Sequence, residues 1–566
     1  MDSLIQPDQQ PVPRPAGAER EDRRRVLVIG LDGATFQLLD DWMDRGIMPN
    51  LKRLAAEGTR AALQSVMPPV TAPAWTSFAT GTRPGRHGVF DFWKREPGTL
   101  RPRIVSVRDM LVPPIWNLLI EAGIPTGLIN VPVSYPPPEQ ASFAISDFIT
   151  PGTAPRFTHP PTLFDELRPL LGEYVIDPPP LESPDGAEAH HMLEGVEHLT
   201  LQQARYAEHL MKTREWGFCM VVFQATDWLQ HRMWDALSGE YEIYRDTPEV
   251  LALRERAEKL LSALDGWIGR LLAASPPETD VFVVSDHGFG PLRQRVKINQ
   301  WLARHGLLAL SRRRRLRGLL GRLDVLRLRH RIKRMLPRPR GGGKSAPPVW
   351  RRIDWRRTRA YAATRSDMGV HVNLRGREPQ GIVSPDEYEE VRDAVLAAMK
   401  ELRHPETGEP ILTSAFRRED LFQGPGLEKA PDLIFILDGG ACNHELRLDG
   451  PLFESTTSGT WTGTHRLDGV LIAHGPRIQR ARRLDQVDII DVAPTVLQLF
   501  GLPAPDHTEG RIPDGLLTPE AASAAAWRQP HRRDDDDLGA GTTPEPEYTE
   551  DETRHVEERL RDLGYL

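Results

Sequence analysis

The sequence predicts an α/β fold: a doubly wound, mostly parallel sheet with helices on both faces and a smaller inserted cap region. Short apolar runs such as Arg25–Leu31, Phe218–Phe223 and Asp280–Ser285 lack the alternation of half-exposed strands and are typical of central parallel strands. Longer segments with helical apolar spacing, such as Leu199–Arg214 and Leu251–Ala274, separate these runs. Strands that alternate with helices favour a parallel sheet covered on both faces.

The remaining elements follow the same alternation. A helical pattern covers Phe36–Gly58, where Pro49 is expected to open a second helix because proline is tolerated in a first turn. Gln224–His231 is expected to be a loop. The other predicted elements are strands at Ala61–Val66, Thr126–Val131, Asp432–Leu437 and Val470–Ala473, and helices beginning near Thr71, at Trp116–Ala122 and at Ile489–Phe500.

Composition divides the chain into three parts. Residues 1–24 are polar and proline-rich and are predicted to be a disordered tail. Residues 25–515 are predicted to form one large domain with an inserted region at about 295–425. Residues 516–566 are predicted to be a charged linker followed by a terminal helix.

Charge and cysteine content narrow the class of protein. The net charge of −7 gives the whole chain no general attraction to nucleic acid. Two cysteines are too few for a disulfide framework and suit a reducing compartment. No signal peptide and no apolar run of about eighteen residues is visible. We therefore expect a cytoplasmic protein.

A basic segment at 312–344 stands apart from this pattern. Arginines fill most of its positions, and Leu316, Leu319 and Leu323 fall near helical spacing. Such a segment suits an anionic membrane surface, which would make the protein peripheral at the membrane, and no specific nucleic-acid partner is predicted. The alternative is a solvated excursion that pairs with the acidic residues Asp534–Asp537.

The stretch Pro68–Gly88 carries a candidate reactive hydroxyl. Thr71 follows Pro-Pro-Val, which favours extended backbone, and precedes Ala-Pro-Ala-Trp, where proline suits a first helical turn. Thr71 is therefore expected at a helix N-terminus, where free N–H groups and the helix dipole attract an anion. The alternative is an ordinary threonine N-cap.

Acidic and imidazole side chains follow several of the predicted strands. Ligands of an open α/β sheet bind beyond the carboxyl ends of its strands, where these side chains are expected to gather. Each piece alone has a simpler explanation as a turn, a helix-surface pair or a polar loop. The candidates are Asp32, Asp227 and His231 four residues apart, the adjacent Asp286 and His287, and His465 in a Gly/Thr-rich loop. Three carboxylates, three imidazoles and one hydroxyl suit two Zn²⁺ ions, with Mn²⁺ as the alternative.

In this order, the motifs resemble the alkaline phosphatase superfamily. The match is to its type I phosphodiesterase/nucleotide pyrophosphatase branch, and more narrowly to predicted phosphohydrolases/phosphomutases. The segments that carry it are VIGLDGATF, PAWTSFATG, RPGRHGVFDF, GVHVNLRGREPQGIV, KAPDLIF and the terminal RLRDLGYL.

The resemblance implies two metal sites and a covalent nucleophile. Asp227, His231 and His465 would hold one ion. Asp32, Thr71, Asp286 and His287 would hold the other, with Thr71 as the nucleophile that forms a phosphothreonine. The N–H group of Ala72 would support the phosphoryl charge, and Arg83 and Arg86 are weaker candidates for phosphate contacts.

This chain differs from the motifs of two related groups of enzymes, and both differences narrow the class of substrate expected. Nucleotide pyrophosphatases carry an asparagine about twenty residues after the nucleophile, where this chain has Phe92, which counts against nucleotides. Sulfatases need Cys or Ser followed by x-Pro-x-Arg, and Thr71–Trp75 lacks both the oxidisable residue and the arginine.

Three functions follow from these observations. The first is a metal-dependent phosphoester hydrolase acting on phosphodiesters or pyrophosphate-like bonds of unknown identity. The second is a phosphomutase resembling the cofactor-independent phosphoglycerate mutases. The third is a non-catalytic scaffold that the basic segment docks on an anionic membrane or on RNA.

Overall fold

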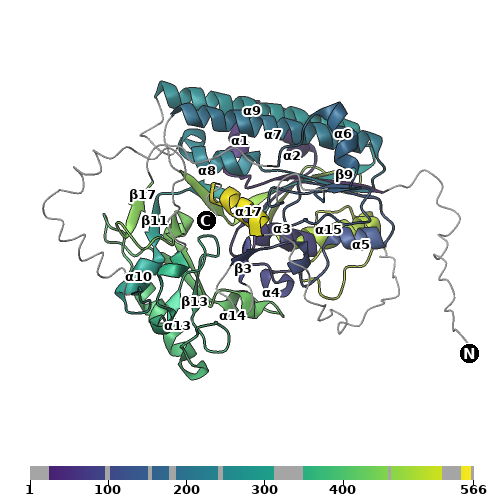
Figure 1. Ribbon diagram of the computed structural model, residues 1–566. Helices are drawn as coiled ribbons and strands as arrows, with labels where there is room; N and C mark the ends of the chain where they lie inside the picture. Colours follow the sequence, from purple (N-terminus) through teal and green to yellow (C-terminus); the bar gives the residue numbers. More distant parts are fainter. Residues whose placement is uncertain are drawn as a thin grey trace, which may run out of the picture.

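A computed structural model describes residues 24–95, 102–150, 156–176, 186–239, 247–311, 349–456, 461–524 and 550–562. A nine-stranded sheet forms its centre (Figure 1). In spatial order its strands are β20 (Arg482–Asp488), β2 (Thr59–Gln64), β19 (Asp468–His474), β9 (Thr279–Val284), β1 (Arg25–Leu31), β8 (Phe218–Phe223), β5 (Thr126–Ile129), β6 (Phe143–Ile145) and β7 (Thr158–His159).

Most neighbouring strands in this sheet are parallel. β1 pairs in parallel with β8 and β9, β5 does so with β6 and β8, and β2 does so with β20. β19 is antiparallel to both of its neighbours, and β7 is antiparallel to β6. The predicted doubly wound, mostly parallel sheet is confirmed.

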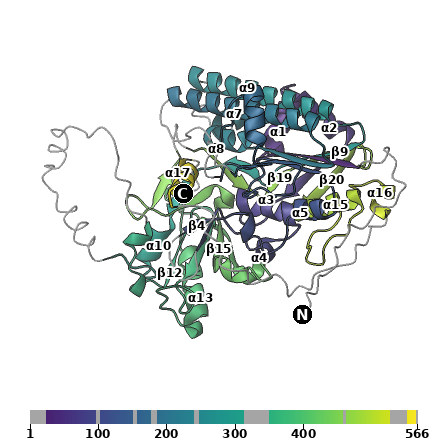
Figure 2. The same ribbon diagram turned by 45° about the vertical axis from the view of Figure 1, so that its right-hand side comes forward.

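Helices cover both faces of the sheet (Figure 1 and Figure 2). Side chains alternate along β1: Leu27 and Ile29 pack into one core, and Val26 and Val28 into the other. The first face carries α1 (Phe36–Asp44), α2 (Pro49–Glu57), α6 (Leu163–Leu171), α7 (Gly186–Thr213), α8 (Ala225–Ser238) and α9 (Pro248–Ala274). The second face carries α3 (Thr71–Thr80), α5 (Ile115–Glu121) and α15 (Val492–Phe500).

A smaller lobe lies beside the carboxyl ends of the strands and has its own apolar core (Figure 1). Its first sheet has the order β16 (Cys442–Glu445), β11 (Gln294–Lys297) and β17 (Phe453–Ser455). Its second has the order β12 (Ala360–Tyr361), β13 (Gly369–Val372), β15 (Leu433–Leu437) and β14 (Leu412–Arg417). Its helices are α10 (Ile298–Arg304), α13 (Tyr388–Lys400) and α14 (Arg418–Leu421).

Short elements complete the described chain. The two-stranded pair β10 (Gly288–Pro291) and β18 (Gly463–Arg466) continues from the main sheet toward the smaller lobe. The others are α4 (Pro84–His87), β3 (Trp93–Arg95), β4 (Pro102–Ile104), α16 (Pro519–Ser523) and α17 (Glu550–Asp562). In α17, Val556 and Leu560 are buried against the core of the first face.

Two predicted loops are wrong. His465 was expected in a loop, but it lies in β18, where it pairs with Phe289 of β10. Gln224–His231 was expected to be a loop, but Ala225–Ser238 is helical and ends at Gly239 in the left-handed conformation. The helix is buried on every side, with Trp228, Leu229 and Trp234 all in the core. The polar side chains of this helix, such as Asp227, Gln230 and His231, are buried as well, so the sequence does not show an apolar face opposite an exposed polar one.

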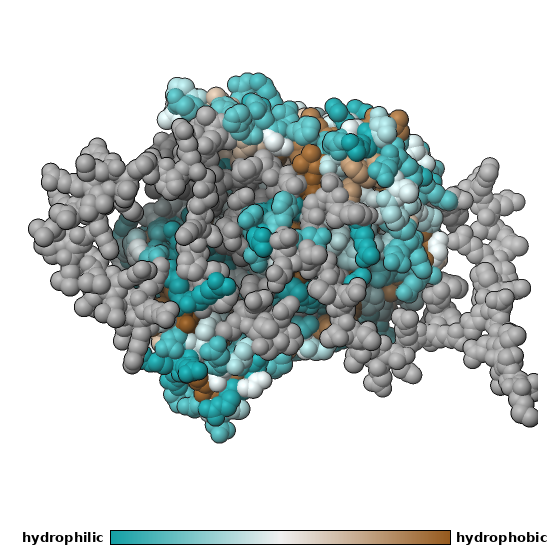
Figure 3. Space-filling model, in the orientation of Figure 1, coloured by the Kyte–Doolittle hydropathy of each residue, from teal (hydrophilic) through white to brown (hydrophobic). Residues whose placement is uncertain are grey.

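Three predicted segments lie outside the described residues: 1–23 of the N-terminal tail, the basic segment 312–344, and 525–549 of the charged linker with Asp534–Asp537. The domain boundaries therefore stay predictions. Figure 3 shows hydrophilic residues over most of the coloured surface on this face. None of the helices in the described ranges combines the length and apolarity that crossing a bilayer requires.

Candidate metal centre

The site forms where three neighbouring central strands end. Asp32 directly follows β1, and Asp286 stands two residues after β9. Asp227 lies in the first turn of α8, which follows β8. Because β9, β1 and β8 are adjacent and parallel, their carboxyl ends bring the three carboxylates to one edge of the sheet.

Backbone carbonyls orient all three site histidines. The Nδ1 atom of His465 lies 2.8 Å from the Pro69 carbonyl oxygen. Those of His231 and His287 lie 3.1 Å from the carbonyl oxygens of Gly463 and Gly288. A carbonyl only accepts, so each Nδ1 donates and each Nε2 presents a lone pair. Metal-binding histidines show this arrangement.

The Nε2 atoms converge on the carboxylates in two groups of possible metal ligands. Within each group the ligand atoms lie within 4.8 Å of one another. His465 Nε2 is 2.9 Å from His231 Nε2 and 3.2 Å from Asp227 Oδ1. The groups are Asp227, His231 and His465, and Asp32, Asp286 and His287.

The two groups adjoin each other. The rings of His287 and His465 stack with their centroids 3.7 Å apart. His287 Nε2 is 3.2 Å from Asp286 Oδ2 and 3.7 Å from Asp32 Oδ1. The six side chains predicted from scattered positions therefore share one buried site.

Burial and mutual repulsion shift the pKa values of the carboxyl groups. Burial raises the pKa of Asp32 well above its usual value, and the charges of Asp286 and Asp227 add to the effect. Burial likewise raises the pKa of Asp286 to about 7. Burial also acts to raise the pKa of Asp227, but His231 and His465 outweigh it and the value is lowered to about 2. A cation bound between these groups would stabilise their charged forms.

Unused hydrogen-bonding capacity fits a cation as well. Asp32 Oδ1 and Asp286 Oδ2 are buried and accept no hydrogen bond from the described residues. Two imidazole Nε2 lone pairs that face each other at 2.9 Å also repel unless a positive charge lies between them. Nitrogen and carboxylate ligands of this kind suit Zn²⁺ or Mn²⁺.

Thr71 is the first residue of α3 and lies at the same centre. Its Oγ1 is 3.5 Å from His287 Nε2, and the side chain is buried. Val70 precedes the helix in extended conformation and makes no side-chain cap hydrogen bond. The hydroxyl thus stands at the positive end of a helix, beside the N–H groups of Ala72 and its neighbours.

Several supporting side chains were not predicted. Trp75 Nε1 donates to Asp32 Oδ2 at 3.0 Å. Thr226 Oγ1 donates to the Asp32 carbonyl at 2.6 Å, and Gln230 Nε2 donates to the Gly33 carbonyl at 2.8 Å. Of these three side chains, only Trp75 could have been predicted from the sequence. It lies one helical turn after Thr71, on the same face of the predicted helix.

Of the two arginines of the nucleophile segment, Arg83 has another side-chain partner. The Nη2 atom of Arg83 donates to Asp488 Oδ2 at 3.0 Å. Arg86 lies in α4, which meets the smaller lobe: a Cβ on Gly424 would come within 3.1 Å of the Arg86 Cα. The phosphate contacts expected for both stay predictions.

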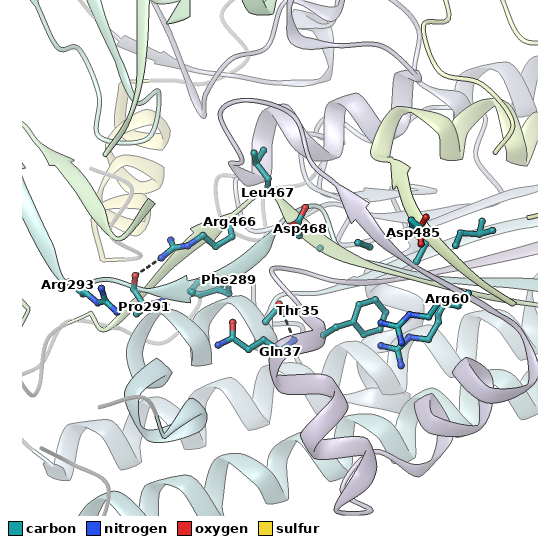
Figure 4. A pocket seen from close by; sticks show the side chains of 17 residues that line it. Thr35, Gln37, Arg60, Phe289, Pro291, Arg293, Arg466, Leu467, Asp468 and Asp485 are labelled. Carbon is teal, nitrogen blue, oxygen red and sulfur yellow. Dashed lines mark hydrogen bonds between the residues drawn. The ribbon is translucent and has the colours of Figure 1, made fainter. Parts of the chain in front are cut away.

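A separate cavity of about 1050 Å³ lies near the centre but contains none of the predicted site residues. Figure 4 shows Arg60 and Asp485 on one side of it and Arg293 and Arg466 on the other. Phe289 lies between this cavity and the metal centre. Its ring lines the cavity, and the centroid of the ring is 5.3 Å from that of His465. The cavity is therefore a neighbour of the metal centre.

Comparison with known proteins gives the family. The profile of a family described as type I phosphodiesterase / nucleotide pyrophosphatase matches residues 26–446. The chain belongs to this family. The predicted resemblance is confirmed, and the family places the chain in the alkaline phosphatase superfamily as a phosphoric ester hydrolase that uses divalent metal ions. Of the seven predicted metal ligands, six fall inside the matched residues and His465 follows them.

Solved structures of similar proteins have low sequence identity. Murine ectonucleotide pyrophosphatase / phosphodiesterase 5 is 12% identical with a TM-score of 0.47, covering 88% of this chain and 100% of its own. Phosphonoacetate hydrolase from Sinorhizobium meliloti 1021, in complex with phosphonoformate, is 17% identical with a TM-score of 0.49, covering 83% and 94%. Comparison with curated protein sequences found no match.

Proposed function

We propose that this type I phosphodiesterase-like enzyme hydrolyses phosphodiesters or pyrophosphate-like bonds with two divalent metal ions and Thr71 as covalent nucleophile. The observation that carries the proposal is the convergence of three imidazole Nε2 atoms and three carboxylates beside the Thr71 hydroxyl. Asp227, His231 and His465 would hold one ion, and Asp32, Asp286, His287 and Thr71 the other. We propose Zn²⁺, with Mn²⁺ as the alternative.

The bound ions would supply Lewis-acid stabilisation and lower the pKa of a bound hydroxyl. The chain itself would place Thr71 Oγ1 for in-line attack on phosphorus. The bond to phosphorus forms as the bond to the leaving oxygen breaks, giving a phosphothreonine. Water then cleaves this ester and restores the threonine hydroxyl. Backbone N–H groups at the start of α3, including that of Ala72, support the developing negative charge.

The first test uses Thr71 itself. We expect Thr71→Ala to lower kcat for bis-p-nitrophenyl phosphate by at least about a thousandfold, because nucleophilic and electrostatic contributions are lost together. Thr71→Ser keeps the hydroxyl and should retain measurable activity. A phosphorylated Thr71 in acid-quenched wild-type protein, found by mass spectrometry, would support the intermediate. Full activity of Thr71→Ala would exclude it.

Comparing substrates separates the alternatives. Faster release of p-nitrophenol from bis-p-nitrophenyl phosphate than from p-nitrophenyl phosphate indicates a diesterase. Phosphoryl transfer between hydroxyls without release of phosphate would instead favour the phosphomutase.

The proposed location is cytoplasmic, with the basic segment 312–344 in contact with an anionic membrane. Basic residues bind anionic lipid through charge, and salt screens the interaction. Flotation with liposomes that contain phosphatidylserine should require this segment. Salt-independent flotation, or flotation of the chain without the segment, would exclude electrostatic docking.

A further inference from the structure

The smaller lobe presents a charged strand face to the metal centre. In β11, Arg295 pairs with Asn443 of β16 and Glu454 of β17. Residues paired across neighbouring strands share one face of a sheet. Asn443 Nδ2 lies 2.9 Å from Thr464 Oγ1, and Thr464 directly precedes His465. The face that carries Arg295 therefore reaches β18, the strand that contains the predicted metal ligand His465.

A second connection ties the start of β11 to His231. The Leu292 N–H donates to the Thr462 carbonyl at 2.7 Å, and the Thr462 N–H donates to the His231 carbonyl at 2.9 Å. This connection and the contact between Asn443 and Thr464 place the strand that carries Arg295 beside the site.

Positive charge exceeds negative charge on this face. Arg365 holds Glu445 through two contacts of 2.9 and 3.1 Å, and Lys297 Nζ donates to Glu454 Oε1 at 2.6 Å. Within the described chain, no carboxylate forms an ion pair with Arg295. The cluster contains the cations Arg295, Lys297, Arg365 and Arg447, and the carboxylates Glu445 and Glu454. Four cations against two anions leave an excess of two positive charges.

The loop that carries Arg365 is anchored to the main lobe. Ser366 Oγ donates to Asp91 Oδ1 at 2.7 Å, and Asp91 is buried. Asp91 follows the nucleophile segment, in the region where the family's asparagine is absent. Arg365 therefore has a fixed position relative to both lobes, and its positive charge is close enough to contribute, after burial, to a lowered pKa of Arg295.

We propose that Arg295 and Arg365 bind a second anionic group of the substrate, so that the natural substrate is a phosphoester that also carries another phosphate or a carboxylate. The inference rests on the proposed function. A guanidinium binds phosphate or carboxylate through paired hydrogen bonds, and a half-buried guanidinium without a paired carboxylate gains most from such an anion. This surplus charge would select doubly anionic substrates.

Matched inhibitors test the proposal. Glycerol 3-phosphate and 3-phosphoglycerate differ by one carboxylate. Adenosine 5′-monophosphate and adenosine 3′,5′-bisphosphate differ by one phosphate. For the wild type we expect the second charge to lower the inhibition constant against bis-p-nitrophenyl phosphate roughly tenfold or more in at least one pair. If the inhibition constant falls in the first pair, the second anionic group of the substrate is a carboxylate. If it falls in the second pair, that group is a phosphate.

Variants at β11 assign the effect to a residue. Arg295→Gln should remove most of that preference, and Arg295→Lys should restore only part of it because a lysine cannot make the paired contact. Arg293→Gln is the matched control, since Arg293 is exposed and lines the separate cavity. It removes the same charge two residues away and should leave the preference intact.

Calorimetric binding of the same compounds keeps this test separate from the proposed function. If the protein hydrolyses nothing but binds the doubly charged compound more tightly through Arg295, only the proposed function fails. If it hydrolyses bis-p-nitrophenyl phosphate but shows no preference for a second charge, the inference is overturned. It is also overturned if Arg295→Gln keeps the wild-type preference.

Discussion

At the residue scale, the indole N–H of Trp75 orients the carboxylate of Asp32. It donates to Asp32 Oδ2 and leaves Asp32 Oδ1 as the remaining acceptor atom. Partners of this kind orient metal ligands, and losing one typically costs about 10- to 100-fold in metal affinity or activity.

Trp75→Phe is therefore expected to weaken metal binding by about tenfold while keeping most of the buried ring. Titration of the metal-free protein with metal measures the change in metal affinity. Trp116→Phe is the control, because the buried Trp116 Nε1 has no hydrogen-bond partner in the described structure. Equal effects of the two substitutions would show that the indole N–H of Trp75 has no role in orienting Asp32.

Asp147 is a buried carboxyl group outside the metal centre, and it gives a pH dependence. Burial raises its pKa from 3.8 to about 7, against hydrogen bonds from the N–H groups of Val133 and Ile149. The unfolded chain loses this proton near pH 4 and the folded chain near pH 7, so the folded state binds more protons between them. Its contribution to stability is therefore greatest below pH 4 and declines up to about pH 7.

We expect Asp147→Asn to remove this decline, which amounts to at most about 1.4 kcal/mol per pH unit. Urea unfolding of both proteins at several pH values across this window measures the difference. The same pH dependence in both proteins would show that Asp147 does not hold the proton.

At the element scale, α4 links the nucleophile segment to the smaller lobe. The Gly426 N–H donates to the Gly85 carbonyl at 2.7 Å. A Cβ on Gly85 would lie 2.4 Å from the Gln423 carbonyl oxygen, and that backbone has no flexible end that can move aside. The two loops can approach this closely only with glycine at position 85.

We expect Gly85→Ala to lower both the melting temperature and kcat, because it pushes the smaller lobe away from the nucleophile segment. Gly266→Ala is the control: no atom lies within 4 Å of its added Cβ, and α9 should gain up to about 1 kcal/mol. Calorimetry and bis-p-nitrophenyl phosphate kinetics measure both variants. An unchanged Gly85→Ala enzyme would mean that the contact between the loops is not needed.

At the scale of the whole molecule, the metal centre joins segments that are far apart in the chain. Asp32 and His465 come from opposite ends of the main domain, and the ligands are buried except for His465, which is partly buried. A cation that binds only the folded state stabilises it by RT ln(1 + [L]/Kd), about 2.7 kcal/mol at a hundredfold excess over Kd.

Chelation is therefore expected to lower the melting temperature by several degrees and to abolish hydrolysis, and Zn²⁺ or Mn²⁺ should restore both. Scanning calorimetry with EDTA, and then with each metal in excess, measures the change. The Asp286→Asn protein serves as comparison and should respond less to added metal. A melting temperature that is independent of chelator and metal would contradict the proposed centre.

The sequence by itself determined most of the order of strands and helices and the candidates for the site residues. Continuous apolar runs end in Asp32 and Asp286-His287, and parallel strands bring their carboxyl ends to one edge whatever the details of packing. Local sequence patterns were sufficient to predict these strand ends. They failed for α8, where burial on every side removed the helical periodicity.

Only the tertiary structure decided how these residues meet and what surrounds them. The tautomers of the three histidines depend on carbonyls of Pro69, Gly463 and Gly288, two of them in other segments of the chain. The position of Arg295 depends on the pairing of β11 with strands more than a hundred residues away. Such contacts are non-local, and neither periodicity nor spacing records which distant carbonyl or strand becomes the neighbour.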